Sequence, residues 1–120
     1  MAHETAPHLG REMLDCIDEC QHCHATCLAT VQHCLEMGGK HAEARHIALL
    51  LDCAQICATS ADFMLRNSPH HHRTCAACAE ISRACAEDCE RVDPNDAMMK
   101  ECAEACRQCA DECEQMAAST

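Results

Sequence analysis

The chain has 120 residues, the length of a single domain, and a formal net charge of −11. Leu, Ile, Val and Phe together supply only 15 residues, whereas Cys supplies 15, Ala 21 and Met seven, so the core must be built largely from methyl groups and sulfur. Trp and Tyr are absent and 20 acidic residues outnumber nine basic ones. The chain therefore lacks the aromatic platforms and the positive charge with which proteins bind nucleic acid.

The first eight residues, Met1 to His8, contain neither a basic segment nor an apolar one, and so do not match a secretion signal. No apolar run approaches the roughly 18 residues of a membrane span. We therefore expect a cytoplasmic protein that does not bind membranes. In a reducing cytosol, abundant cysteine favours metal ligands or redox groups over a disulfide framework.

Glycine and proline divide the chain into four segments that predict helices. A Gly-Gly pair at 38–39 ends the first segment, and Ser68 and Pro69 give an N-cap and a first helical position for the third. An Asp-Pro pair at 93–94 repeats that signal. Because the links have only two to four residues, neighbouring helices must be antiparallel. The prediction is an all-α, up-down-up-down four-helix bundle forming one domain over 1–120, with helices at about 6–37, 40–66, 69–92 and 94–117.

Cysteine spacing predicts which face of each helix lies inside the bundle. Most successive cysteines are three, four or seven residues apart, so at about 100° per residue each set falls on one narrow stripe. Acidic residues such as Glu12, Glu19, Asp88, Glu104 and Asp111 are expected on the opposite faces. The inward stripes comprise Cys16, Cys20, Cys23, Cys27 and Cys34 in the first helix, Cys53 and Cys57 in the second, Cys75, Cys78, Cys85 and Cys89 in the third, and Cys102, Cys106, Cys109 and Cys113 in the fourth.

Three interpretations of these stripes compete. Cysteine is often a small buried hydrophobe, but aliphatic side chains would fill fifteen core positions better. Disulfides are a second possibility, yet cysteines four residues apart on one helix, such as Cys16 and Cys20, are poorly directed for bridging. Metal ligation suits the same spacing well. The stripes therefore predict a metal-binding core.

Thiolate chemistry limits the choice of metal to Cu(I), zinc or iron–sulfur clusters. A zinc site of four thiolates keeps a net charge of −2, which is costly when repeated in a dry core. Iron–sulfur clusters need four cysteines gathered at one point, which a continuous ladder does not isolate. Cu(I) accepts two thiolates and a thiolate can bridge two coppers, so about one Cu(I) per sulfur leaves the core near neutral. Charge balance favours multiple Cu(I) ions.

This pattern resembles that of the bacterial copper storage proteins, over about residues 9 to 117, and the absence of an export signal is similar to their cytosolic branch. The resemblance implies a four-helix bundle, commonly a homotetramer, that stores many Cu(I) ions and is not an enzyme. Its residues are the C-x-x-x-C pairs Cys16/Cys20, Cys23/Cys27, Cys53/Cys57, Cys85/Cys89, Cys102/Cys106 and Cys109/Cys113, with Cys34, Cys75 and Cys78 also facing inward.

One end of the predicted bundle carries softer ligands beyond Cys16. Antiparallel folding brings Met13, Met64, His71 and Met116 to nearly one level. Thioether and imidazole bind Cu(I) more weakly than thiolate, so this ring could pass ions to the cysteines. The alternative is that the methionines fill core gaps and His71 belongs to a solvated histidine cap.

The opposite end offers Cys34, His46 and Met99, and we expect His46 on the core stripe as a further ligand, with Leu50 as a possible plug of that end. The remaining histidines are expected to be exposed or to flank the core: His3, His22, His24, His33 and His41.

The second predicted helix has another apolar line, turned about 100° from its cysteines, which a monomer would expose. Such a stripe typically mediates association between helices, so we expect a homo-oligomer. The line consists of Ile47, Leu51, Ala54, Ala58 and Leu65.

Two other functions remain open beside Cu(I) storage. A thiol oxidoreductase or electron carrier needs an accessible low-pKa thiol with a partner, commonly C-x-x-C at a helix start. The C-x-x-C pairs of this chain, such as Cys20/Cys23, lie inside helices and face the core. A zinc or broad heavy-metal sink could use the same ligands as copper.

Overall fold

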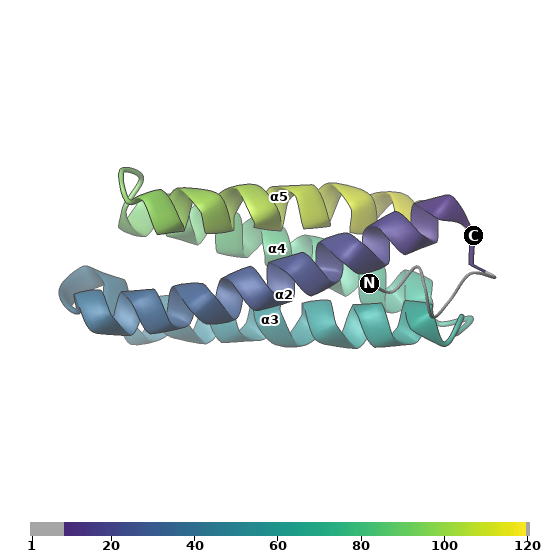
Figure 1. Ribbon diagram of the computed structural model, residues 1–120, viewed down its shortest axis with the longest axis horizontal. Coiled ribbons are helices and arrows are strands. Elements are labelled where there is room, and N and C mark those ends of the chain that lie inside the picture. Colours follow the sequence, from purple (N-terminus) through teal and green to yellow (C-terminus); the bar gives the residue numbers. More distant parts are fainter. Residues whose placement is uncertain (1–8, 120) are drawn as a thin grey trace.

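The structure, a computed structural model, describes residues 9–119. Four helices lie side by side along its 46 Å long axis, and no strand occurs among those residues (Figure 1). The helices are α2 (Arg11–Met37), α3 (Ala44–Leu65), α4 (His71–Val92) and α5 (Ala97–Ala118), with a 3-10 turn, η1 (Gly39–Ala42), between α2 and α3. The predicted all-α fold is confirmed.

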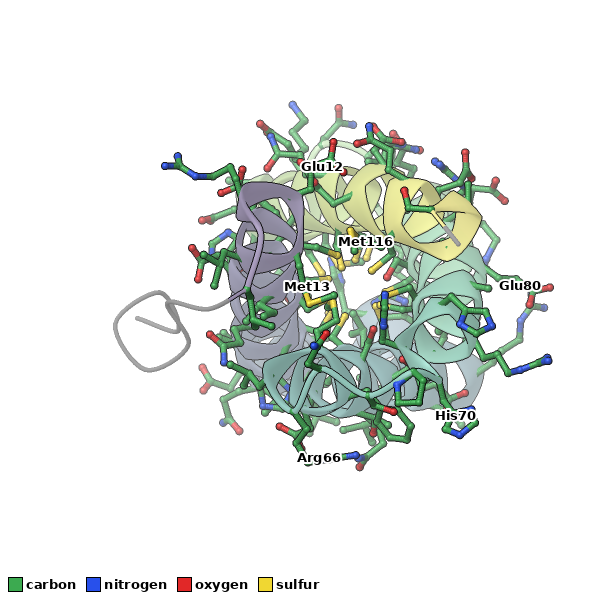
Figure 2. The ribbon with its side chains drawn as sticks, turned by 90° about the vertical axis from the view of Figure 1, so that its right-hand side faces the viewer. Glu12, Met13, Arg66, His70, Glu80 and Met116 are labelled. Atoms are coloured by element: carbon green, nitrogen blue, oxygen red, sulfur yellow. The ribbon has the colours of Figure 1, made fainter. Side chains whose placement is uncertain are left out.

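Each helix packs against two others. Helix α2 contacts α3 and α5, and α4 contacts the same two helices from the other side. Viewed from one end, the four helices enclose a column of sulfur atoms, with charged and polar side chains pointing outwards (Figure 2). Successive helices run in opposite directions (Figure 1). The predicted four-helix bundle with a cysteine-lined core is therefore confirmed.

The end of α2 lies where the glycine pair predicts it. Gly38 and Gly39 have φ angles of +71° and +55°, a region that glycine adopts without strain from a side chain. The N–H of Gly38 donates to the carbonyl of Cys34 at 3.0 Å and closes the helix. At the other end, α2 begins at Arg11 rather than at about residue 6; residues 6–8 lie outside the described part of the chain.

The other three helices begin later than the sequence suggests. Helix α3 begins at Ala44, not 40, because η1 occupies the intervening residues. Helix α4 begins at His71, not 69: the hydroxyl of Ser68 accepts the N–H of His70 within a turn. Helix α5 begins at Ala97, not 94, because the carboxylate of Asp96 caps it. A 3-10 turn before α3, a turn at Ser68 before α4 and the Asp96 cap of α5 thus move these boundaries by two to four residues.

The second apolar line on α3 is only partly exposed. Leu51 is 46% exposed, whereas Ala54 is 2% exposed because it packs within the bundle. The carbonyl of Ala54 lies 2.8 Å from Nδ1 of His24 on α2. The expectation that a single chain would expose the entire line is therefore wrong at Ala54 and holds at Leu51.

Helix α3 is also the one helix among the described residues that is long and apolar enough, by length and composition, to cross a membrane, with a mean hydropathy of 1.4. Acidic residues such as Asp52 interrupt its apolar run without lowering the average much, so the helix passes this test without containing an unbroken apolar run. A core helix of a bundle has the same composition. In this structure, α3 packs against α2 and α4 and contributes Cys53 and Cys57 to the core.

Candidate metal centre

All fifteen cysteines are buried and free, and none is more than 1% exposed. They come from all four helices, and the 3-4 spacing turns each of them inward. The shortest separations between Sγ atoms of neighbouring cysteines are 3.4–4.0 Å, far longer than the sulfur–sulfur bond of a disulfide. The core is therefore a column of thiols rather than a disulfide framework.

Two levels of this column are nearly equilateral triangles of sulfur. Cys23, Cys53 and Cys106 have Sγ separations of 3.9, 3.7 and 3.9 Å. At the next level, the separations among Cys57, Cys78 and Cys109 are 3.7, 3.8 and 3.8 Å. An ion at the centre of such a triangle would lie about 2.2 Å from each sulfur, close to the ~2.3 Å of a zinc–thiolate bond. Three thiolates could hold one ion without movement of the backbone.

The levels are linked to one another through shared sulfurs. Cys27 lies 3.8 Å from Cys106 and 3.9 Å from Cys102, while Cys20 lies 3.7 Å from Cys109 and 3.4 Å from Cys113. Several cysteines belong to two potential metal-binding groups at once. The groups include Cys20/Cys78/Cys109/Cys113, Cys23/Cys27/Cys53/Cys106, Cys27/Cys85/Cys102/Cys106, Cys16/Cys75/Cys113 and Cys23/Cys57/Cys109. Shared sulfurs suit bridging thiolates better than separate, closed metal sites.

Electrostatics favour a protonated thiol at Cys34, at one end of the column. Burial raises the pKa of Cys34 from its ordinary value of 9.0 to about 11, and the negative charges of Asp96 and Cys102 add to this. A metal ion must therefore displace a proton from this thiol near neutral pH. The positive charge of the ion replaces that of the proton, so loading need not place bare thiolates in the core.

Two serines that the cysteine pattern did not reveal complete the inward stripes. Ser82 is fully buried, with its hydroxyl 3.5 Å from Sγ of Cys53. Ser60 is also fully buried, and its hydroxyl lies 3.3 Å from Sγ of Cys75. Their spacing of three and four residues from neighbouring cysteines was the available signal. A hydroxyl at these positions can donate a hydrogen bond to a thiolate.

Figure 2 shows the end of the bundle at which the ring of soft ligands is predicted. Met13 and Met116 flank the sulfur column there, and Met64 is fully buried with Sδ 3.7 Å from Sγ of Cys75. His71 is half-buried and its Nδ1 lies 2.7 Å from the carbonyl of Ser68, which leaves Nε2 for another partner. Met64 thus extends the sulfur column beyond Cys75, the first cysteine of α4.

At the opposite end, the structure brings together three different donors. Sγ of Cys34 lies 3.5 Å from Nε2 of His46 and 3.6 Å from Sδ of Met99. His46 is fully buried, as its position on the core stripe suggests. Leu50, on the neighbouring turn of α3, is fully buried as well. The thiol of Cys34 therefore lies next to both an imidazole and a thioether.

Asp88 is the acidic residue that the sequence placed incorrectly, because it is only 5% exposed rather than on an outer face. Its Oδ2 lies 2.8 Å from Nδ1 of His46, and its Oδ1 accepts from Nε of Arg91 at 2.8 Å. Burial opposes ionisation of Asp88, but the hydrogen bonds from His46 and Arg91 outweigh it and hold its pKa below the usual range. These partners explain how a carboxylate is accommodated there.

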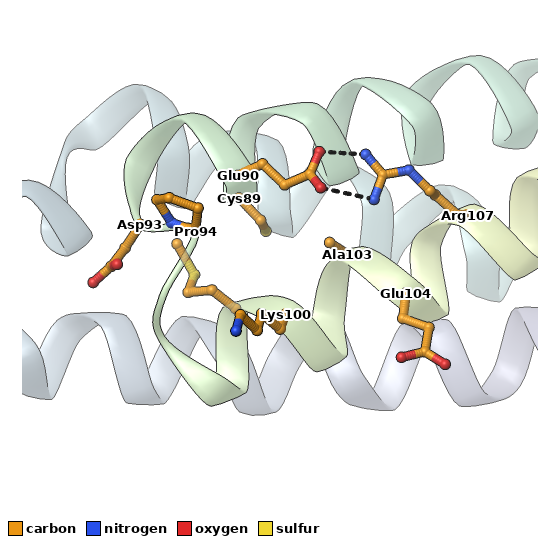
Figure 3. Close-up of a pocket in the computed structure, with 9 residues that line it drawn as sticks. Cys89, Glu90, Asp93, Pro94, Lys100, Ala103, Glu104 and Arg107 are labelled. Atoms are coloured by element: carbon orange, nitrogen blue, oxygen red, sulfur yellow. Dashed lines mark hydrogen bonds and ion pairs between the residues drawn. The ribbon is translucent and has the colours of Figure 1, made fainter.

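A surface hollow of about 380 Å³ lies between α4 and α5 near this end (Figure 3). Cys89 and Met99 are among the residues that line it, and an ion pair between Glu90 and Arg107 crosses one side. The hollow therefore approaches the sulfur column from the side of the bundle. No such route was predicted from the sequence.

Among the remaining histidines, the prediction for His41 is wrong. His41 was expected to be exposed or flanking, but it is 5% exposed because η1 packs against α2 and α3. Its Nε2 lies 3.0 Å from Oδ2 of Asp93, and His33 lies 2.9 Å from Oδ2 of Asp96. His22 is exposed, as expected, and His3 lies outside the described residues.

Comparison with known proteins assigns this cysteine-lined bundle to a family. Residues 10–118 match the family described as Csp, copper storage protein, and the chain belongs to that family. It is 37% identical over 78 residues to the uncharacterized cysteine-rich protein YhjQ of Bacillus subtilis, covering 65% of this chain and 72% of that protein.

Solved structures agree with this assignment. The protein Nmul_A1745 from Nitrosospira multiformis is 49% identical, with a TM-score of 0.86 over 92% of this chain and 98% of its own. The Cu(I)-bound copper storage protein BsCsp3 is 35% identical, with a TM-score of 0.83 over 90% of this chain and 100% of its own. The copper storage protein Ccsp from Streptomyces lividans, loaded with 10 copper equivalents, is 30% identical, with a TM-score of 0.83 over 91% and 86%. The predicted resemblance to copper storage proteins is confirmed.

Proposed function

We propose that this chain stores and buffers Cu(I) in the cytoplasm, binds many ions at once and is not an enzyme. The observation that carries the proposal is the continuous column of shared sulfurs, in which two triangles are linked to further thiols at each end. Membership of the copper storage protein family supports it. Neighbours of similar structure are described as Cu(I)-bound or as a cytosolic copper storage protein.

Charge decides between copper and zinc, because the sulfur spacing suits either ion. A zinc ion with four thiolates leaves a charge of −2 at each site, and several such sites in one dry core would repel one another. Cu(I) with bridging thiolates leaves the column near neutral. A redox function is disfavoured since every thiol is buried.

We assign the ligands in two groups. The fifteen cysteines hold the stored ions, and softer donors at the two ends bind ions in passage. The storage ligands are Cys16, Cys20, Cys23, Cys27, Cys34, Cys53, Cys57, Cys75, Cys78, Cys85, Cys89, Cys102, Cys106, Cys109 and Cys113, and the terminal ligands are Met13, Met64, His71 and Met116 at one end and His46 at the other.

Self-association through the α2–α3 face is part of the proposal, with a homotetramer as the assembly that the family resemblance implies. Leu28 and Leu35 on α2 are 43% and 53% exposed, and Leu51 on the adjoining α3 is 46% exposed. Large apolar side chains gathered on two neighbouring helices favour burial against another copy. No thiol lies on this face, so assembly and storage use different surfaces of the helices.

Sulfur sharing makes a testable statement about capacity. Cys106 lies within 4 Å of Cys23, Cys27 and Cys53, so Cys106→Ala should lower the number of Cu(I) ions bound by more than one. Cys34→Ala is the matched control at the end of the column and should remove at most one ion. Anaerobic loading followed by metal analysis measures both. Equal, wild-type capacity in both variants would contradict storage through shared thiolates.

A further inference from the structure

Two histidines and two aspartates gather where the connection between α2 and α3 meets the connection between α4 and α5. Nε2 of His33, on α2, lies 2.9 Å from Oδ2 of Asp96. Nε2 of His41, on η1, lies 3.0 Å from Oδ2 of Asp93 and 3.9 Å from the same Oδ2 of Asp96. The two imidazole rings are nearly perpendicular, with centroids 6.2 Å apart. Both Nε2 atoms therefore approach the carboxylate of Asp96, and that of His41 also approaches Asp93.

The strongest sign that this cluster binds a ligand is the state of His41. Its side chain is more than nine-tenths buried, and among the described residues its buried Nε2 has no hydrogen-bond partner. Asp93 is close enough but lacks the alignment of a hydrogen bond to that nitrogen. A buried polar atom without a partner is destabilising. An ion between the imidazole and the carboxylates would satisfy it.

Asp96 is held in a position suited to binding a cation. Its Oδ1 accepts the N–H of Met99 at 2.9 Å as the N-cap of α5 and also lies 3.1 Å from Nε2 of His33, while its Oδ2 lies within 4 Å of both histidines. Outer hydrogen bonds of this kind fix the orientation of a ligating carboxylate. With both histidines neutral, the two carboxylates give the cluster a charge of −2, which a divalent cation would cancel.

We propose that His33, His41, Asp93 and Asp96 form a second metal site, which takes a divalent cation of the zinc class and joins the two connections at this end of the bundle. Zinc accepts imidazole nitrogen and carboxylate oxygen in a tetrahedron, in which ligand atoms about 2.0–2.1 Å from the ion are roughly 3.3 Å apart. The nitrogen–oxygen distances of 2.9–3.9 Å span that value. Because the donors are nitrogen and oxygen, Cu(I) prefers the thiolates and the two sites select different ions.

Cobalt(II) can test the site in the presence of copper. The full-length chain is first saturated anaerobically with Cu(I) so that the thiolates are occupied, and Co²⁺ is then titrated as a coloured substitute for zinc. We expect one Co²⁺ per chain, visible ligand-field bands of a four-coordinate ion, no sulfur-to-cobalt charge-transfer band, and displacement by one equivalent of Zn²⁺. Absence of binding, or a spectrum with sulfur charge transfer, would overturn the proposal.

Substitutions separate this site from copper storage. His41→Gln and, independently, Asp93→Asn should each weaken Co²⁺ binding by about 10- to 100-fold or more. Loss of a residue that only hydrogen-bonds to a metal ligand already has an effect of about that size, and loss of a ligand itself should have at least as large an effect. Both variants should load Cu(I) to the wild-type endpoint. His70→Gln, at the other end of the bundle, is the control and should bind Co²⁺ normally. Wild-type Co²⁺ affinity in both ligand variants would exclude the site. Uptake of only a few Cu(I) ions by the wild-type chain would instead count against copper storage and would leave this site unaffected.

Discussion

Nδ1 of His46 lies 2.8 Å from Oδ2 of Asp88, and both side chains are buried at one end of the sulfur column. The carboxylate accepts the proton of Nδ1, so Nε2 is the imidazole nitrogen that faces the thiol of Cys34. Arg91 binds the second oxygen of the carboxylate and pairs with Glu43 of the neighbouring connection. This arrangement fixes the tautomer and the direction of the imidazole.

Replacing Asp88 should therefore affect stability more than capacity. Asp88→Asn removes the charge that His46 and Arg91 bind, and the reduced apo protein should lose about 1–3 kcal/mol of unfolding free energy. The Cu(I) endpoint should change by at most one ion. Urea denaturation followed by circular dichroism measures the first effect. Asp52→Asn on the exposed face of α3 is the control, and equal stability of the two variants would contradict the buried network.

The methionine end makes a prediction about rates. Replacing Met13, Met64 and Met116 together with Leu keeps approximate volume but removes three soft donors, so stability should change little. Loading from a chelated Cu(I) donor, and release to a competing ligand, should slow while the endpoint changes by at most an ion or two. Stopped-flow absorbance measures both rates. Unchanged rates here, with slower rates after Met99→Leu, would place the mouth at the opposite end, near the hollow of Figure 3.

Self-association should depend on the exposed leucines of the α2–α3 face. Leu51→Glu places a charge in the proposed interface and should shift the protein towards smaller species, with no change in Cu(I) capacity because Leu51 faces away from the thiols. Sedimentation velocity measures the shift. Ala84→Glu, on the exposed side of α4, is the control. A wild-type protein that sediments as a monomer would show that the proposed interface is wrong.

The pKa of Cys34 predicts how the apo protein responds to alkali. Burial raises this pKa from 9.0 to about 11, so between those values the unfolded chain has lost the proton that the folded chain keeps. Stability should therefore be fully present below pH 9 and fall as the pH rises towards 11. Denaturant unfolding at a series of pH values checks the slope, and Cys34→Ala should make it shallower. A slope equal to wild type in that variant would contradict the assignment.

Much of the fold could be predicted because the turn-forming residues and the spacing of the cysteines both indicate the same four helices. The glycine pair at 38–39 ended α2 where expected, and the 3-4 spacing of cysteine identified the inward face of every helix. Asp88 was placed outside because its burial depends on His46, 42 residues away, and a local pattern cannot reveal that partner. His41 was misplaced for a similar reason, since its burial follows from the packing of η1.

The two buried serines show a different limit of prediction from the sequence. Ser60 and Ser82 lie three or four residues from neighbouring cysteines, so the helical spacing alone predicts that both positions face the core. A pattern defined by thiols alone does not include them. Their hydroxyls now lie within hydrogen-bonding reach of core sulfurs, which was visible only after the helices were assembled.

Anaerobic Cu(I) titration of the reduced protein against a competing chelator, with Zn²⁺ titrated in parallel, tests the central claim most directly. The account predicts tight binding of many Cu(I) ions, on the order of one per cysteine, because each thiolate can bridge two ions. It also predicts that zinc does not displace copper from the sulfur column. Saturation at only three or four Cu(I) ions, or displacement of copper by zinc, would contradict copper storage.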